Sequence, residues 1–132
     1  MSQNQITKIN DGLSYSNNYV QKGDFGLSWA NTTSGIYFRR IGRNIRFSLI
    51  LDIGVQTTLN GSTDYNIGKG YIPSWALGEN ELARFPIFAG YGVVGVLIIN
   101  IGSNTTNILL RFLNNITLNV GGSLSVYDNY FI

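Results

Sequence analysis

Residues 35–54, GIYFRRIGRNIRFSLILDIG, decide the fold class. The two halves have the pattern of strands, and a tight turn is predicted between them at Gly42-Arg43. In the second half, alternate positions are apolar, namely Ile45, Phe47, Leu49, Leu51 and Ile53. The intervening positions carry Arg46, Ser48, Ile50 and Asp52. A period of two over about nine residues is typical of a strand with one buried face, and a helix would need three- and four-residue spacing.

Shorter apolar runs follow this hairpin at roughly ten-residue intervals, with turn signals such as Asn60-Gly61 and Gly121-Gly122 between them. The predicted extended segments are residues 19–29, 65–67, 85–88, 93–101, 107–113, 116–120 and 123–131. The spacing predicts an all-β, antiparallel β-sandwich or jelly-roll-like domain over residues 19–132. Residues 1–18 are polar and without periodicity, and we expect a connector or loosely docked arm there.

Two local predictions accompany this pattern. Residues 74–84, SWALGENELAR, are the one candidate helix, but Gly78 inside them favours a single irregular turn. In the last two strands we expect one buried face made of Ile116, Leu118 and Val120, and then of Leu124, Val126 and Tyr130.

The composition narrows the chemistry. The chain has 132 residues, enough for one domain, and only 12% of them are charged, with a net charge of +2. Polarity comes from Asn, Ser, Thr and Gly, which suits neutral, hydroxyl-rich ligands and permanent assemblies. The sequence has no Cys and no His, so disulfides, thiolate or imidazole metal sites and His-dependent catalytic triads are excluded. We expect no metal and no cofactor.

No segment of the sequence has the pattern of a membrane or export signal. The N-terminal residues lack an apolar core segment, and the run at 93–99 is too short to span a bilayer. The sequence therefore predicts neither a secretory signal nor membrane insertion.

Two predicted strands, at residues 93–101 and 108–113, are apolar on both faces. In an antiparallel domain of this size one face normally meets water, so something must cover the second face. The cover is either a set of loops from the same chain or another subunit. On the second alternative we expect a homo-oligomer whose interface includes Val94, Val96, Ile98, Leu110, Phe112, Arg39 and Arg40.

Catalytic candidates are few. Glu79 and Glu81 are the one close carboxylate pair, and a pair of carboxyls is what a glycosidase needs, but neighbours in a polar loop are more simply solvated. The segment GYGVVG at 90–95 precedes a strand instead of opening a helix, which argues against a phosphate-binding loop. No catalytic residue is predicted.

Four arginines, Arg39, Arg40, Arg43 and Arg46, cluster around the central turn. They have two interpretations: an anion or nucleic-acid patch, or a charged hairpin edge that prevents aggregation or forms inter-subunit ion pairs. Because no aromatic-interleaved RNA-binding motif accompanies them, we favour the second and expect no nucleic-acid partner.

Aromatic side chains beside amides and carboxylates are suited to binding sugars, because rings stack on C–H faces while polar groups fix hydroxyls. The candidate saccharide site is residues 64–75, with Trp75 as the anchor. Its members are Trp75, Tyr71, Asp64, Asn66 and Tyr65. Trp29 and Tyr37, which fall on predicted strands, are expected in the core.

The order of these signals resembles the C-terminal head domain of siphophage receptor-binding proteins of the lactococcal baseplate type. The resemblance rests on GIYFRRIGRNIRFSLIL, a polar Gly-rich span, Tyr71-Ile72-Pro73, Phe85-Pro86-Ile87 and the terminal SLSVYDNYFI. It covers about residues 25–132. It consists of a similar order of strands and turns along the sequence and includes no diagnostic motif.

The resemblance implies a trimeric head in the virion tail or baseplate that binds host cell-surface saccharide and contacts other tail proteins. Some such heads use His in their sugar sites, and this chain has none, so no binding residue is carried over. The shoulder and neck of those proteins have no counterpart in residues 1–18. Two alternatives remain open: a structural tail or virion assembly protein without ligand, and a glycan hydrolase that uses Glu79 and Glu81.

Overall fold

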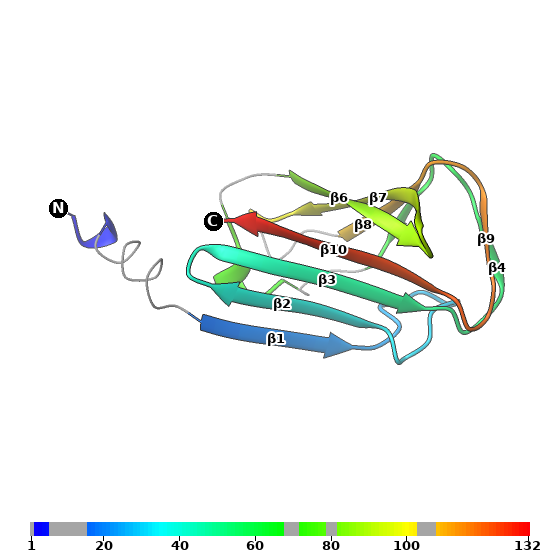
Figure 1. The fold of residues 1–132 in the computed structure, drawn as a ribbon, viewed down its shortest axis with the longest axis horizontal. Helices are drawn as coiled ribbons and strands as arrows, with labels where there is room; N and C mark the ends of the chain where they lie inside the picture. The colour runs from blue at the N-terminus through cyan, green and yellow to red at the C-terminus, as the bar shows by residue number, and fades with distance from the viewer. Residues whose placement is uncertain (1, 6–15, 68–71, 79–81, 103–107) are drawn as a thin grey trace.

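The computed structural model describes residues 2–5, 16–67, 72–78, 82–102 and 108–132. Within these ranges the chain forms ten strands, one helical turn at residues 3–5 and one short 3₁₀ helix, η1 (Figure 1). The strands are β1 (Ser16–Lys22), β2 (Gly35–Ile41), β3 (Asn44–Asp52), β4 (Thr57–Leu59), β5 (Asp64–Asn66), β6 (Leu82–Ala89), β7 (Gly92–Asn100), β8 (Ile108–Phe112), β9 (Ile116–Leu118) and β10 (Ser123–Phe131), and η1 is Ser74–Ala76. In this part of the chain no helix has the length and apolar character needed to cross a membrane.

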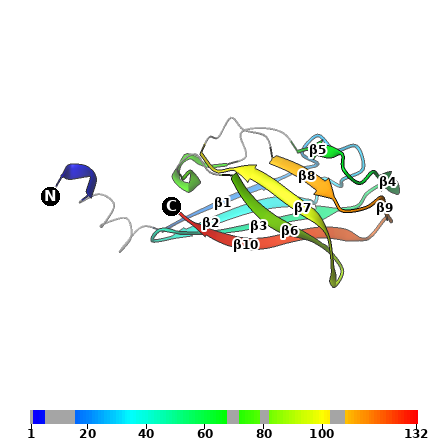
Figure 2. The same cartoon turned by 90° about the horizontal axis from the view of Figure 1, so that it is seen from above.

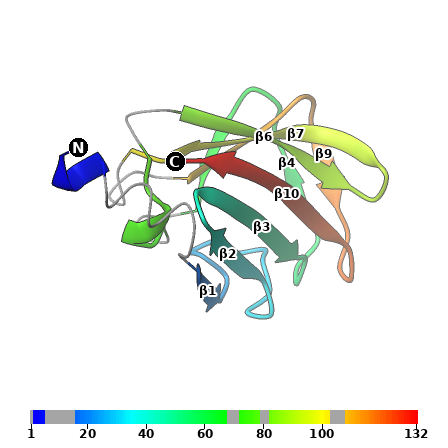
Figure 3. The same ribbon diagram turned by 60° about the vertical axis from the view of Figure 1, so that its left-hand side comes forward.

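Eight strands form one antiparallel sheet in the order β1-β2-β3-β10-β6-β7-β8-β5. Strands β10 and β6 pair only where Leu124 and Ser125 face Ala89 and Phe88. Beyond this short contact the sheet bends and folds over itself, so that β1-β2-β3-β10 and β6-β7-β8-β5 become two layers (Figures 2 and 3). The small β4-β9 sheet lies at one end (Figure 1). The all-β, antiparallel, sandwich-like fold expected from the sequence is confirmed.

The space between the layers is filled by the inward side chains of both. Phe47 of β3 stacks on Phe85 of β6 with ring centroids 5.6 Å apart, and Phe38 lies 5.0 Å from Phe47. The five alternate apolar positions of residues 45–53 are each at most 3% exposed. The predicted hairpin is confirmed as β2 and β3, and Gly42 in its turn has a φ of +61°, a conformation that glycine adopts without strain.

Other local predictions have mixed outcomes. Residues 74–84 form only the single turn of η1 and then the start of β6, as the irregular-turn interpretation predicts. Leu124, Val126, Tyr130 and Trp29 are buried as expected. The prediction for Val120 is wrong, because β9 ends at Leu118 and the chain turns through Gly121, which leaves Val120 exposed.

The edge strand β1 begins at Ser16, inside the segment predicted to be an arm. Its backbone pairs with β2 along the whole of β1, from Ser16 opposite Ile41 to Lys22 opposite Gly35. Residues 19–22 of β1 belong to the predicted extended segment 19–29, whereas residues 16–18 are polar and give no strand signal, because an edge strand that buries little needs no apolar alternation. Of the other residues of the predicted arm, 3–5 form a helical turn, and 1 and 6–15 lie outside the described residues.

Strands β7 and β8 explain the two-faced apolar segments. Leu110 and Phe112 point between the layers and are fully buried beside Leu97 and Gly95 of β7. The prediction that these two side chains lie at a subunit interface is therefore wrong, because they belong to the core of their own chain. Val94 also packs against this core.

The opposite face of β7 carries Val96 and Ile98, which are paired with Arg111 and Leu109 of β8. Val96 is partly exposed, and Ile98, although buried, lies outside the main core cluster. These two predicted interface residues therefore lie on the outer face of the second layer.

Candidate functional site

The predicted saccharide site is not assembled as one site. Trp75 lies in η1, half-buried against the core, and its carbonyl oxygen accepts a hydrogen bond from Arg40 Nη1 at 3.0 Å. Asp64, Tyr65 and Asn66 form β5, and Figure 2 shows β5 and η1 at opposite ends of the second layer. Tyr71 lies outside the described residues.

The polar groups of β5 have structural partners. Asp64 forms a two-pronged contact with Arg111, at 2.7 Å from Nε to Oδ1 and 3.0 Å from Nη2 to Oδ2. The hydrogen bond from Arg111 lowers the pKa of the Asp64 carboxyl. The Tyr65 hydroxyl accepts a hydrogen bond from the Asn60 backbone N–H, and the Tyr65 ring packs edge-on against Phe112. These contacts fix a sheet edge and leave little for a ligand.

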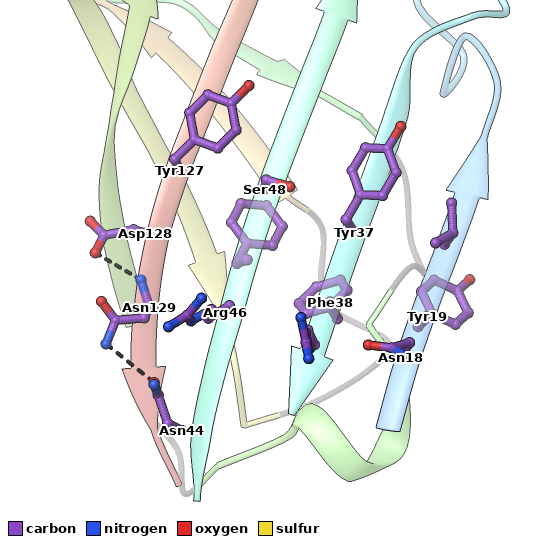
Figure 4. Close-up of a pocket in the computed structure, with 13 residues that line it drawn as sticks. Asn18, Tyr19, Tyr37, Phe38, Asn44, Arg46, Ser48, Tyr127, Asp128 and Asn129 are labelled. Carbon is purple, nitrogen blue, oxygen red and sulfur yellow. Dashed lines mark hydrogen bonds between the residues drawn. The ribbon is translucent and has the colours of Figure 1, made fainter. Parts of the chain in front are cut away.

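A groove of about 860 Å³ lies instead on the outer face of the β1-β2-β3-β10 layer (Figure 4). Its lining comes from all four strands. The lining residues are Asn18, Tyr19, Val20, Tyr37, Phe38, Arg39, Asn44, Arg46, Phe47, Ser48, Tyr127, Asp128 and Asn129.

Strand register sorts the outward side chains of this groove into two rows that run across the sheet. The first, here called the aromatic row, is Val20, Tyr37, Ser48 and Tyr127. The second, here called the arginine row, is Asn18, Arg39, Arg46 and Asn129. The rows are two residues apart along each strand, or roughly 7 Å.

The Tyr37 ring packs over Gly35, which has no side chain to occupy that space. A Cβ built on Gly35 would lie 2.6 Å from the Tyr37 hydroxyl oxygen and 2.9 Å from its Cζ, so the ring lies back over the Gly35 backbone. The Lys22 ammonium group lies 5.7 Å from the centre of the same ring. The ring is thereby fixed on the sheet surface with little freedom to lose on binding.

Tyr127 lies in the same row on the far side of Ser48, and Figure 4 shows both tyrosine hydroxyls directed toward the same end of the sheet. Two strand spacings separate the tyrosine positions, roughly 9–10 Å. Tyr127 is 59% exposed. The pair brackets a floor formed by the small hydroxyl of Ser48, a geometry that suits a flat ligand with polar groups at its rim.

The arginine row is the charged part of the groove. Arg39 and Arg46 are direct cross-strand neighbours. Amides stand at both ends of the row, and the Asn129 side-chain amide donates to Asn44 Oδ1 at 3.2 Å. Asp128, the one acid in the lining, accepts a hydrogen bond from the Asn129 backbone N–H at 2.8 Å.

Arg40, the neighbour of Arg39, has a different role from the one predicted. It is 6% exposed, its Nε donates to the Gly42 carbonyl at 2.7 Å and its Nη1 to Trp75. The prediction that Arg40 lies at a subunit interface is wrong, because alternation along β2 turns its side chain toward the same chain's own η1. Arg39, one residue earlier, points outward into the groove.

The described lining of the groove holds groups for stacking and hydrogen bonding, and one carboxylate. Its one carboxylate has no second carboxylate among the lining residues, and in the described ranges no cluster of three His, Cys, Asp or Glu could hold a metal. Glu79 and Glu81 lie outside the described residues. Stacking on the tyrosines and hydrogen bonding to Ser48 and the amides are what the arrangement offers.

The prediction that Tyr37 lies in the core is wrong. Ile36 and Phe38 are the buried residues of β2, so period-two alternation puts Tyr37 on the outer face. Applying the alternation of β3 to β2 as well would have found it. No protein-family model and no curated protein matches the sequence, so the groove stands without a family assignment.

Proposed function

We propose that the chain is a non-catalytic saccharide-binding domain whose binding site is the groove on the β1-β2-β3-β10 layer. The observation that carries this proposal is the aromatic row, in which Tyr37 and Tyr127 flank Ser48 beside a row of amides and guanidinium groups. Aromatic rings supply contact area at low conformational cost, and amides supply donors and acceptors for hydroxyls. The proposal replaces Trp75 and the β5 residues as the predicted site.

In this proposal the domain is the receptor-binding part of a phage tail or baseplate, and its ligand is a host cell-surface polysaccharide. The order of the hairpin and the terminal strand along the sequence supports this assignment. A composition poor in charged residues and rich in Asn, Ser and Thr also supports it. Other tail proteins would be its partners.

Self-association is part of the same proposal. The outer face of the second layer carries Val96 and Ile98, and Leu82 at the start of β6 is 55% exposed. Burying this face against other copies would remove apolar surface from water and place several grooves in one particle. A trimer is the assembly that the resemblance implies.

The experiment that tests saccharide binding is a glycan array, followed by purified cell-wall polysaccharides of candidate hosts. Tyr37→Ala and Tyr127→Ala should each weaken binding about tenfold or more, because each removes a stacking face. Tyr91→Ala is the matched control, since Tyr91 is fully exposed in the β6–β7 turn and is not among the groove residues.

Melting temperatures of the three variants establish that each is folded. Equal binding by Tyr37→Ala, Tyr127→Ala and Tyr91→Ala would remove the groove from the binding site. If the wild-type protein bound none of the glycans or polysaccharides, the result would favour a structural role without ligand.

A further inference from the structure

We infer that the saccharide bound in the groove carries an oxyanion, a phosphodiester or a carboxylate, and that Arg39 and Arg46 bind it. This inference rests on the proposed saccharide function and adds the charge class of the ligand. It starts from the register of β2 and β3, which places Arg39 directly opposite Arg46 on the outer face.

Two like charges directly opposite each other on neighbouring strands destabilise a sheet. In most proteins a nearby carboxylate would relieve that repulsion. Among the described residues, neither Arg39 nor Arg46 has an ion-pair or hydrogen-bond partner. Their neighbours in the row are Asn18 and Asn129, which carry no charge.

The nearest acid in the groove does not occupy this position. Asp128 is opposite Phe47 in the register, one residue out of the arginine row, and its carboxylate is bonded to the Asn129 backbone. Figure 4 shows Asp128 and Arg46 on different sides of β10, with Arg46 extending from β3 toward that strand. The arginine row therefore keeps two unneutralised guanidinium groups over a single strand spacing.

Apolar side chains lie on both sides of this charge. Tyr37 and Tyr127 stand in the aromatic row, and on the other side Ile41 and Phe131, 48% and 71% exposed, flank Asn44 in the next row. A bound ligand would cover these surfaces and exclude water, which strengthens a charge-assisted hydrogen bond. Guanidinium groups bind phosphate and carboxylate oxygens in preference to neutral hydroxyls.

The two rows together specify a ligand with an apolar ring face on Tyr37 or Tyr127 and an oxyanion roughly 7 Å away along the strands. An anionic polysaccharide has both groups on one chain. A nucleic acid also has both, but the whole chain has a net charge of only +2, and Arg39 and Arg46 are the two basic residues in the groove lining, fewer than the extended basic surface typical of nucleic-acid binding.

The test is an NMR titration of the full chain, with dimethyl phosphate and sodium acetate as probes at constant ionic strength. The Nε–H signals of Arg39 and Arg46 should shift and saturate at roughly millimolar probe, and the stronger of the two probes identifies the anion. Arg39→Gln and Arg46→Gln should each weaken probe binding about tenfold or more. Arg84→Gln, the same charge change at an exposed site of β6 outside the groove, should leave it unchanged.

Shifts that do not saturate, or equal losses in Arg39→Gln and Arg84→Gln, would overturn the inference. A neutral glycan that requires Tyr37 yet binds equally well to Arg39→Gln, without any saturable anion binding, would leave the saccharide function standing and remove the anion site. Arg39-dependent binding of an oligo(dT) strand, tighter than that of any phosphorylated or carboxylated glycan, would overturn the saccharide assignment and leave the anion site.

Discussion

Gly35 shapes the groove because it has no side chain. Its missing Cβ leaves the space into which the Tyr37 ring folds, and this contact fixes the position of the partly exposed ring. Gly35 is the first residue of β2, and a glycine in a sheet costs stability relative to residues with side chains, part of which an aromatic ring packed over it recovers. Gly35 therefore serves the sheet and the groove at once.

Gly35→Ala is expected to weaken glycan binding severalfold while the protein stays folded. The new methyl group would stand 2.6 Å from the Tyr37 hydroxyl oxygen, and the ring, as the flexible end of a side chain, would swing away from the sheet. Binding to the polysaccharide that the wild type recognises measures the effect, and the melting temperature monitors the fold.

Gly54→Ala is the control, because its Cβ would meet Asn31 atoms at 3.5 Å, an ordinary contact away from the groove. If Gly35→Ala bound as well as Gly54→Ala, the placement of Tyr37 over Gly35 would have no part in recognition.

At the scale of elements, η1 is too short to be stable alone and depends on contacts from the first layer. The Tyr130 hydroxyl of β10 donates to the Ala76 carbonyl at 2.8 Å, and Arg40 of β2 donates to the neighbouring Trp75 carbonyl. These two carbonyls belong to the last residues of η1, which lack partners inside so short a helix. Burial raises the pKa of the Tyr130 hydroxyl.

Because the pKa of Tyr130 is raised in the folded state, the free energy of unfolding should decrease at alkaline pH. The stabilisation from protonated Tyr130 is complete below the unfolded tyrosine pKa of about 10 and is lost as pH rises above it. For one proton the free energy of unfolding should fall with a limiting slope of about 1.4 kcal/mol per pH unit. Urea denaturation at a series of pH values between 8 and about 11.5 measures it.

Tyr130→Phe should remove this contribution to the alkaline slope and cost about 1 kcal/mol at neutral pH through the lost hydrogen bond. Tyr91→Phe, at a fully exposed position, provides the comparison. The same alkaline slope in the wild type and Tyr130→Phe would show that other groups control the transition.

The pairing of strands that are distant in sequence is what the sequence alone could not predict. Alternation in residues 45–53 was enough to predict β3 and its buried face, because side-chain period depends only on the strand itself. The groove depends on β10 lying beside β3, which places Tyr127 opposite Ser48. That pairing joins segments far apart in the chain, and period-two patterns do not state which strands are neighbours.

The errors at Leu110 and Trp75 have the same origin. Leu110 belongs to an apolar run whose two faces look alike in sequence, and only the bend at β10 and β6 determines which face is inside. The sequence predicts Trp75 and Asp64 in one site because both belong to what reads as a single polar loop. In the structure β5 and η1 lie at opposite ends of the second layer (Figure 2).

For the whole molecule, the two outer faces have different characters. The β1-β2-β3-β10 face is polar and aromatic and holds the groove, whereas the β6-β7-β8-β5 face presents Val96, Ile98 and Leu109. Assembly through the second face would leave every groove open to solvent. Linked weak sites raise avidity by roughly 10²–10⁴ where geometry allows simultaneous engagement.

Val96→Lys is therefore expected to reduce an oligomer to monomers and to weaken binding to immobilised polysaccharide by roughly 10²–10⁴, with single-site affinity for a short glycan unchanged. The lysine would place an unpaired charge beside Arg111 in the centre of the proposed interface. Light scattering at micromolar concentration gives the mass, and binding to the immobilised polysaccharide gives the avidity.

Val55→Lys is the control, because it introduces the same charge at a site 57% exposed between β3 and β4 and should change neither the mass nor the avidity. A monomer mass for the wild type would contradict the proposed assembly. An oligomer of unchanged mass for Val96→Lys would show that the interface is on another face, because a lysine buried against Arg111 would disrupt an interface at this position.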